Sequence, residues 1–418
     1  MENNMSILTL ISLLFLLTAI CGAINLKYLK LPMTIGIMIA AFIFSIILFI
    51  SDYFLSFFSG FSFAQKIVSQ INFPTLLLNG ALAFLLFAGS LQISLHELWK
   101  TRYNIASLSI IGTLLSILFL GLVFWVLFYL FSIPISLLWC LTLGAIIAPT
   151  DPVSVISMFG RLGLSKRLQA IFAGESLFND GIALIAFTTF LSVIIHQKTP
   201  STTSLFLISI KEIIGSGLLG IITATIVIFI IRRLSHNEIT ILFSLALAAG
   251  TFSIASDLNM SGPIAVVASG LLIGNHLQKQ PAEKSDSVIY CWHVIDEILN
   301  TMLFLIIGLQ IVIIPFSYHI LVITFLAFPF LAITRFIALS LSGFVLLYQD
   351  SNPKGLISIL TWGGLRGGIS LAIALSLPNI FPKNEILLIC YGCVVLTVLI
   401  QGLTMEYVVN YFYRKEIN

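Results

Sequence analysis

A short run of polar residues inside an apolar stretch is the first candidate for chemistry in this sequence. It reads Gly174-Glu-Ser-Leu-Phe-Asn-Asp-Gly181 and contains two carboxylates, Glu175 and Asp180. On an α-helix Ser176 and Asp180 share a face one turn apart, and Asn179 flanks that face. Glu175 points about 140° away from Asp180, because each helical residue advances by about 100°. The two acids are therefore expected to have different surroundings and different roles.

A second polar group lies where an apolar helix is expected to break. The sequence Ala148-Pro-Thr-Asp-Pro152 has two prolines three residues apart, and each removes a backbone donor and clashes with the preceding turn. Such a break at membrane depth is tolerated only where it lines a cavity or is buried in protein. Thr150 and Asp151 would join Asp180, Ser176 and the neighbouring asparagine in presenting carboxylate, hydroxyl and carbonyl oxygens. These oxygens form a ligand set for a hard cation.

A third motif, Gly363-Gly-Leu-Arg-Gly-Gly368, has four glycines in six residues. Each glycine weakens a helix by roughly 1 kcal/mol relative to Ala, so a second break is expected here, with close helix packing as the alternative. Arg366 in this motif and Arg335 are the cations that lie deep within apolar runs. Glu175 is expected to pair with one of them, because an unpaired buried acid costs several kcal/mol.

The composition identifies the elements that position these residues. Of 418 residues, 59% belong to the AVILMFWYC set and only 9% are Asp, Glu, Lys or Arg, against roughly 25% charged in a soluble domain. The apolar runs are long enough to cross about 30 Å of hydrocarbon. The chain is therefore an all-α polytopic membrane protein that is embedded in lipid. A net charge of +3 without a large basic cluster excludes nucleic acid as a partner.

Apolar runs interrupted by charges, Gly or Pro predict thirteen membrane spans. They cover residues 5–24, 32–50, 73–93, 103–131, 134–159, 165–196, 204–233, 238–257, 261–276, 289–315, 318–348, 353–378 and 384–413.

Basic residues predict the direction of these spans. One alternating set of connections contains Lys27, Lys30, Lys100, Arg102, Arg161, Lys166, Arg167, Arg232, Arg233, Lys279, Lys284, Lys354, Arg414 and Lys415, and the opposite set contains Lys66, Lys198, Lys211 and Lys383. Because Lys and Arg are retained in cytoplasmic loops, the N-terminus is expected outside and the C-terminus in the cytoplasm.

The two expected breaks lie in the fifth and twelfth spans, 134–159 and 353–378. These spans are seven apart and so cross the membrane in opposite directions. Paired interrupted segments are typical of transporters built from inverted repeats. The first six and the last six spans would form two such repeats, with unwound helices 5 and 12 crossing each other.

The three motifs together resemble the monovalent cation:proton antiporters of the NhaP and sodium–proton exchanger kind, and the resemblance covers nearly the whole chain. It implies an NhaA-like fold and a homodimer. Residues 1–93 and 204–315 would supply mainly dimerisation or scaffold helices, and residues 103–196 and 318–413 mainly the core that translocates ions. The activity implied is exchange of Na⁺ or Li⁺ for H⁺, without an enzymatic reaction, a cofactor or a soluble partner domain.

The resemblance also implies roles for single residues. Asp180 would bind either the cation or the proton, with Na⁺ held by Asp180, Asp151, Thr150 and Ser176. Asn179 would be the family-typical neighbour of the carboxylate, which is associated with electroneutral one-for-one exchange. Glu175 would pair with Arg366 as a structural bridge. Arg335 matches no motif and would support the polar interior of the core.

Two departures from the family pattern affect what can be transferred. Some members carry a Glu at the position of Ala88, so the role of that Glu in ion coordination does not transfer. The chain ends at Asn418, without the long regulatory tail of the animal exchangers. A prokaryotic protein of the inner membrane is therefore expected.

Other functions remain as alternatives. K⁺/H⁺ exchange is the main rival, because selection among Na⁺, Li⁺ and K⁺ depends on fine cavity geometry. A cation channel would need a continuous polar pore, and a membrane-embedded enzyme would need a nucleophile and base or a metal cluster. His293 with Asp296 and Glu297 could sense pH, since His titrates near neutrality, or could be an interfacial polar cluster.

Overall fold

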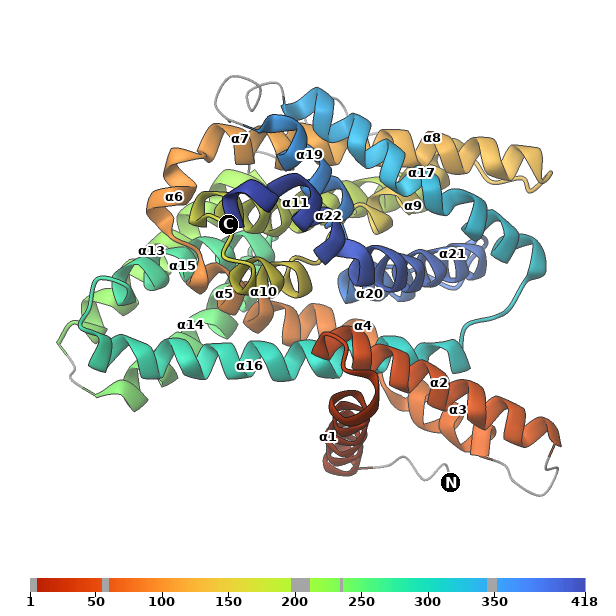
Figure 1. Ribbon diagram of the computed structural model, residues 1–418, viewed down its shortest axis with the longest axis horizontal. Coiled ribbons are helices and arrows are strands. Elements are labelled where there is room, and N and C mark those ends of the chain that lie inside the picture. Colours follow the sequence, from red (N-terminus) through yellow and green to blue (C-terminus); the bar gives the residue numbers. More distant parts are fainter. Residues whose placement is uncertain (1–5, 55–59, 197–210, 234–235, 344–351, 418) are drawn as a thin grey trace.

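The computed structural model describes residues 6–54, 60–196, 211–233, 236–343 and 352–417, and the secondary structure in these ranges is helical (Figure 1). The N-terminal helices are α1 (Ile7–Ile24), η1 (Asn25–Leu29), α2 (Met33–Phe54), α3 (Gly60–Gln70), α4 (Phe73–Leu76), η2 (Leu77–Ala81), α5 (Leu82–Gln92) and α6 (Leu95–Lys100). The central helices are α7 (Arg102–Ala106), η3 (Ser107–Gly112), α8 (Thr113–Leu130), α9 (Leu137–Ile147), α10 (Val153–Arg161), α11 (Lys166–His196), η4 (Lys211–Gly215), α13 (Ser216–Ile231), α14 (Asn237–Asp257) and α15 (Gly262–Leu277). The C-terminal helices are α16 (Ala282–Leu309), η5 (Gln310–Val312), α17 (Tyr318–Ser342), α19 (Pro353–Trp362), α20 (Gly368–Leu375), α21 (Lys383–Leu396), η7 (Thr397–Gly402) and α22 (Leu403–Ile417).

Several helices begin where the sequence offers a capping side chain. The Oδ1 atom of Asn352 accepts a hydrogen bond of 3.0 Å from the Gly355 N–H, and α19 begins at Pro353 directly after it. Proline is favoured at a first helical position because its missing N–H would be unbonded there in any case. Ser261 caps α15 in the same way, accepting from the Ile264 N–H at 3.5 Å.

The helices occupy the expected spans wherever these lie within the described residues, which confirms an all-helical polytopic fold. In the described part of the chain, ten helical segments are long and apolar enough to cross a membrane, and α9 and α15 are shorter apolar helices. Residue 5 and residues 204–210 and 344–348, which belong to three expected spans, lie outside the described residues. The exact number of thirteen crossings stays a prediction. The sequence did not predict α3 and α6, which lie between expected spans.

Both expected helix breaks are present, and they meet. Residues 148–152 separate α9 from α10, and residues 363–367 separate α19 from α20. The N–H of Asp151 in the first break donates a hydrogen bond of 2.7 Å to the carbonyl oxygen of Leu365 in the second. The unwound segments thus satisfy part of each other's backbone, which makes them tolerable in the interior of a membrane protein. The prediction of two crossed, unwound helices is confirmed.

The helices pack in two groups. In one, α15 packs against α5, α13 and α14, while α16 packs against α2 and α5. In the other, α8 packs against α9 and α17, and α21 packs against α17 and α20. In Figure 1, α16 runs horizontally below the helices of the second group, and α13, α14 and α15 lie at the left of the view. We call the first group, around α15 and α16, the scaffold group, and the second, around α8 and α21, the core group. Helix α11 belongs to the core group because it packs on α9, and it also contacts α15.

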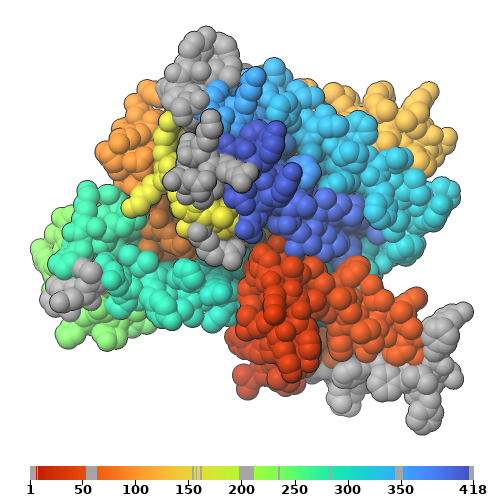
Figure 2. All heavy atoms as spheres, in the orientation of Figure 1, coloured from red at the N-terminus to blue at the C-terminus, as the bar shows by residue number. Residues whose placement is uncertain are grey.

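The surface of the molecule is apolar in long stretches, as expected for contact with lipid. In the space-filling view α1 and α2 project at one corner of the molecule (Figure 2). On α1 the side chains of Leu8, Phe15 and Leu16 are exposed. On α13 the exposed side chains include Leu218, Ile222 and Phe229. An apolar surface of this extent indicates that these helices face lipid or another membrane protein.

Candidate ion-binding site

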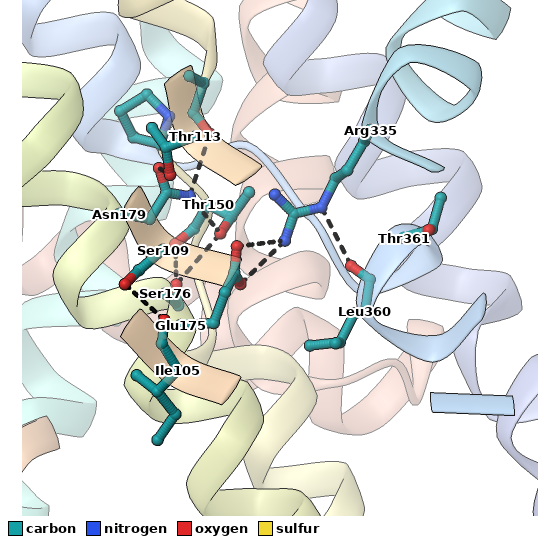
Figure 3. Close-up of polar contacts among 12 residues, drawn as sticks. Ile105, Ser109, Thr113, Thr150, Glu175, Ser176, Asn179, Arg335, Leu360 and Thr361 are labelled. Atoms are coloured by element: carbon teal, nitrogen blue, oxygen red, sulfur yellow. Dashed lines mark hydrogen bonds and ion pairs between the residues drawn. The ribbon is translucent and has the colours of Figure 1, made fainter. Parts of the chain in front are cut away.

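The polar run of α11 is buried at the level of the two helix breaks. Glu175, Ser176, Asn179 and Asp180 are each 5% exposed or less. Figure 3 shows Ser176 and Asn179 directed toward Thr150 in the first break, and Glu175 directed toward Arg335 on α17. The two acids therefore have different surroundings, as their helical positions predicted.

Asn179 of α11 forms hydrogen bonds to both the first break and α8. Its Nδ2 atom donates to the carbonyl oxygen of Ala148 at 3.2 Å and to the Oγ1 atom of Thr150 at 3.1 Å. Its Oδ1 atom accepts a hydrogen bond of 3.0 Å from the hydroxyl of Thr113 (Figure 3). The neutral amide thus uses both donors and an acceptor, and a carboxylate at this position could not make the two donated bonds. Thr113 lies outside the three sequence motifs, and its only signal in the sequence is a hydroxyl inside an apolar span.

Ser176 and Thr150 form a second link between α11 and the break. The Ser176 hydroxyl donates to the backbone carbonyl oxygen of Thr150, and the two side-chain hydroxyl oxygens are 3.2 Å apart. Because the Ser176 proton is used on the carbonyl, the Thr150 hydroxyl donates to Ser176 Oγ. The structure therefore brings together Thr150, Ser176 and Asn179, which the sequence grouped as one polar site.

Asp180 differs from its neighbours because part of its carboxylate has no partner. Its Oδ1 atom is buried and makes no hydrogen bond to any residue that the structure describes. The backbone of Thr150 lies within hydrogen-bonding reach of the carboxylate, and Asp151 and Glu175 are the nearest acids. Asp151 itself is half-buried in the break. An ionised, buried carboxylate with an unbonded oxygen is costly, so a proton or a cation at Asp180 would stabilise this site.

The predicted ion pair between Glu175 and Arg366 is wrong, because Glu175 pairs with Arg335. The Nη2 atom of Arg335 lies 3.2 Å from Oε1 and 3.0 Å from Oε2 of Glu175. The Nε atom of Arg335 also donates to the carbonyl oxygen of Leu360 at 3.1 Å. A Cβ atom at Gly364 would lie 2.4 Å from that Nε. Glycine in the second break thus makes room for Arg335 of α17. From the sequence, Arg335 was predicted to have only a general supporting role.

Arg366 instead compensates the proline break. Its Nη1 atom donates to the carbonyl oxygens of Ala148, at 2.5 Å, and Pro149, at 3.3 Å. In a regular helix the Ala148 carbonyl would accept from the N–H of residue 152, but that residue is Pro152 and has no N–H. The backbone N–H of Arg366 donates to Thr397 Oγ1 at 3.2 Å. Arg366 therefore links the two breaks and supplies a donor to the Ala148 carbonyl, which Pro152 cannot bond.

A cavity of about 720 Å³ approaches the site between the two helix groups. It is lined on α11 by Lys166, Ala173 and Leu177, and in the first break by Pro152. Leu177 lies three residues before Asp180, so the cavity stops about one turn short of that carboxylate. The predicted polar cluster of α16 lies here too, since the lining includes His293, Asp296 and Glu297. An aqueous route of this kind would bring small ions close to the Asp180 carboxylate from one side.

Comparison with known proteins identifies the family of the chain. Residues 14–411 match the family described as sodium/hydrogen exchanger, transmembrane. The chain belongs to the sodium/hydrogen exchanger family. It is 33% identical to the Na(+)/H(+) antiporter NhaP of Pseudomonas aeruginosa over 97% of both chains. It is also 30% identical to the Na(+)/H(+) antiporter NhaH of Halobacillus dabanensis, over 82% of this chain and 85% of that one.

The fold of this exchanger also matches a solved structure. The sodium proton antiporter MjNhaP1 from Methanocaldococcus jannaschii at pH 8 superposes with a TM-score of 0.73, covering 98% of this chain and 99% of that one. The sequence identity is 19%, so this likeness concerns the fold. Within the exchanger fold, Ala88 on α5 is buried next to Gly89, which borders the cavity.

Proposed function

We propose that this chain exchanges Na⁺ for H⁺ across a membrane, with Asp180 binding either ion in turn. The observation that carries the proposal is the buried Asp180 carboxylate beside the crossed breaks, whose Oδ1 makes no hydrogen bond within the described residues. Oxygen atoms of Thr150, Ser176 and Asp151 would complete the Na⁺ site, while Asn179 holds the break in place. Li⁺ would use the same ligands. The two relatives are named for Na⁺ and H⁺, so the rival K⁺/H⁺ exchange has no support from them.

Exchange follows from the cost of a bare charge in the protein interior. Protonated Asp180 is neutral, and ionised Asp180 with bound Na⁺ is also compensated. Ionised Asp180 alone would carry an unpaired charge through a low-dielectric region, which costs several kcal/mol. The core group therefore moves with H⁺ or Na⁺ bound and seldom empty, and this couples the two fluxes. A channel would need a continuous route, whereas the described cavity stops short of Asp180.

The charges at the site support one-for-one exchange. Glu175 is neutralised by Arg335 at 3.0 Å, and Asn179 is an amide whose atoms are used in hydrogen bonds. Among the four polar residues of the α11 run, Asp180 alone can therefore alternate between a proton and a cation. Replacing one H⁺ by one Na⁺ leaves the charge of the moving core unchanged, so transport would be electroneutral.

The placement in the cell and the assembly are part of the same proposal. The excess of Lys and Arg on one set of connections supports a cytoplasmic C-terminus and an external N-terminus. We place the chain in the inner membrane of a prokaryotic cell as a homodimer formed by scaffold helices from residues 1–93 and 204–315. Exposed apolar side chains on α1 and α13 support such a contact. The core would comprise 103–196 and 318–413, and no cofactor is required.

The test is cation-dependent dissipation of a pH gradient in proteoliposomes. Na⁺ and Li⁺ should dissipate the gradient and K⁺ should not, with the same rate when the voltage is clamped at zero. Asp180→Asn should abolish the effect. Asp257→Asn is the matched control, because Asp257 is an exposed carboxylate at the end of α14. Dissipation that persists in Asp180→Asn, or that follows K⁺ alone, would overturn the proposal.

A further inference from the structure

One face of α11 borders the cavity over the first three turns of the helix, and the cavity closes beyond them. Lys166, Ala170, Ala173 and Leu177 all line the cavity, and their spacings of four, three and four residues place them on one stripe of the helix. The eleven residue steps from Lys166 to Leu177 span about 17 Å. The next positions on this face are Asp180 and Gly181, three and four residues after Leu177, and neither is part of the lining. The cavity therefore ends between Leu177 and this pair of residues.

At Gly181 the place of a side chain is taken by Ile264 of α15. A Cβ atom at Gly181 would lie 2.8 Å from Ile264 Cγ1 and 3.2 Å from Cδ1. Contacts under 3.0 Å between carbon atoms force one partner to move, so residue 181 has no room for a methyl group in this conformation. Ile264 is itself buried. Its side chain thus fills the position where the cavity would continue along α11 past Asp180.

Ile264 is held by the scaffold group rather than by α11. It lies in the first turn of α15, and the N-cap residue Ser261 accepts a hydrogen bond from the Ile264 N–H at 3.5 Å. The Ser261 N–H donates to Ser216 Oγ of α13 at 2.8 Å. Since α15 also packs on α5 and α14, the isoleucine is fixed on one side of the contact. Gly181 is fixed on the other side, in the helix that carries the binding carboxylate.

We propose that Ile264 is the barrier that closes the route beyond Asp180 in this conformation, and that the missing side chain at Gly181 lets this conformation form. The inference rests on the proposed exchange function, because it identifies the contact that must separate when the core moves relative to the scaffold. A methyl group at residue 181 would crowd Ile264 only while the two groups are in the observed arrangement. It should therefore shift the population away from the conformation with the open cavity.

The test measures how accessible the cavity is, independently of transport. In the full chain with its five cysteines replaced, Ala173→Cys places one thiol in the cavity lining. Alkylation by a bulky hydrophilic maleimide in detergent reports the fraction of molecules with the cavity open. Gly181→Ala should slow alkylation by roughly fivefold or more, the shift that overpacking of this size produces. Gly250→Ala is the matched control, because a Cβ there meets no atom of the described residues within 4 Å apart from its own helix backbone.

The decisive comparison is a double-mutant cycle. Gly181→Ala should have little effect on alkylation when Ile264 is changed to Ala, because the methyl group then has room. Should Gly181→Ala fail to fold, Ile264→Phe enlarges the same contact from the scaffold side and should also slow alkylation. An equal effect of Gly181→Ala with and without Ile264, or an unchanged alkylation rate together with lower thermal stability, would overturn the proposal. Because the assay needs no transported ion, a failure of Na⁺/H⁺ exchange would leave its result readable.

Discussion

The Glu175–Arg335 ion pair leads to a prediction that distinguishes Arg335 from Arg366 as the partner of the buried Glu175. We consider Glu175→Gln, Arg335→Met, Arg366→Met and the two double variants that contain Glu175→Gln. Arg335→Met leaves a buried carboxylate without its cation, and removing one member of a buried pair costs about 3–5 kcal/mol. The bond from Arg335 Nε to the Leu360 carbonyl is lost as well, which adds about 1–3 kcal/mol.

The double variant Glu175→Gln/Arg335→Met should recover much of that loss, because no uncompensated charge then remains. We expect a coupling free energy of about 3 kcal/mol between residues 175 and 335. Arg366→Met should destabilise the chain by removing donors to the Ala148 and Pro149 carbonyls. Glu175→Gln should not relieve that loss, and the coupling should stay below about 1 kcal/mol.

The assay is reversible unfolding of the purified chain from mixed micelles by SDS titration, followed by circular dichroism. The free energy of unfolding of each single and double variant gives the two coupling values directly. Gly250→Ala, at an open helix position, controls for a general effect of substitution. A larger coupling between residues 175 and 366 than between 175 and 335 would refute the assignment of the ion pair.

Three further changes have defined outcomes. Asn179→Asp should add a carboxylate that must also be protonated or paired, so exchange should become voltage-sensitive in proteoliposomes; unchanged electroneutral exchange would contradict this. Thr397→Val removes the acceptor of the Arg366 N–H and should lower the free energy of unfolding by about 1–3 kcal/mol, whereas Thr397→Ser should be close to wild type. Gly364→Ala would bring a Cβ within 2.4 Å of Arg335 Nε and should cost about 1–3 kcal/mol; a thermal unfolding midpoint equal to that of wild type would argue against this crowding.

The sequence predicted the composition of the site better than its pairings. Helical spacing was enough to put Ser176 and Asp180 on one face and Glu175 on another, because that geometry is local. The choice between Arg335 and Arg366 was not local. Both arginines lie deep in apolar runs, and which one reaches Glu175 depends on how α17 packs beside the second break. Depth along a span can be estimated from the sequence, but the direction that a distant side chain faces cannot.

The sequence did contain a signal for the actual role of Arg366, which had been predicted to pair with Glu175. Pro152 lies four residues after Ala148, so the Ala148 carbonyl was bound to lack its helical donor. A buried arginine expected nearby is a suitable replacement, and Arg366 fills this role. The hydroxyl of Thr113 had no comparable signal, because its bond to Asn179 depends on the packing of α8 against α11. The closure of the cavity at Gly181 likewise depends on tertiary packing, since it requires Ile264 of α15.

The proposed transport depends on a single carboxylate, Asp180, that exchanges one proton for one cation. The most direct measurement is the number of protons released per Na⁺ bound by the purified chain in weakly buffered detergent solution. We predict one proton per Na⁺ for the wild type, and neither Na⁺ binding nor proton release for Asp180→Asn. Na⁺ binding without proton release, or equal proton release by Asp180→Asn, would contradict the central role of Asp180.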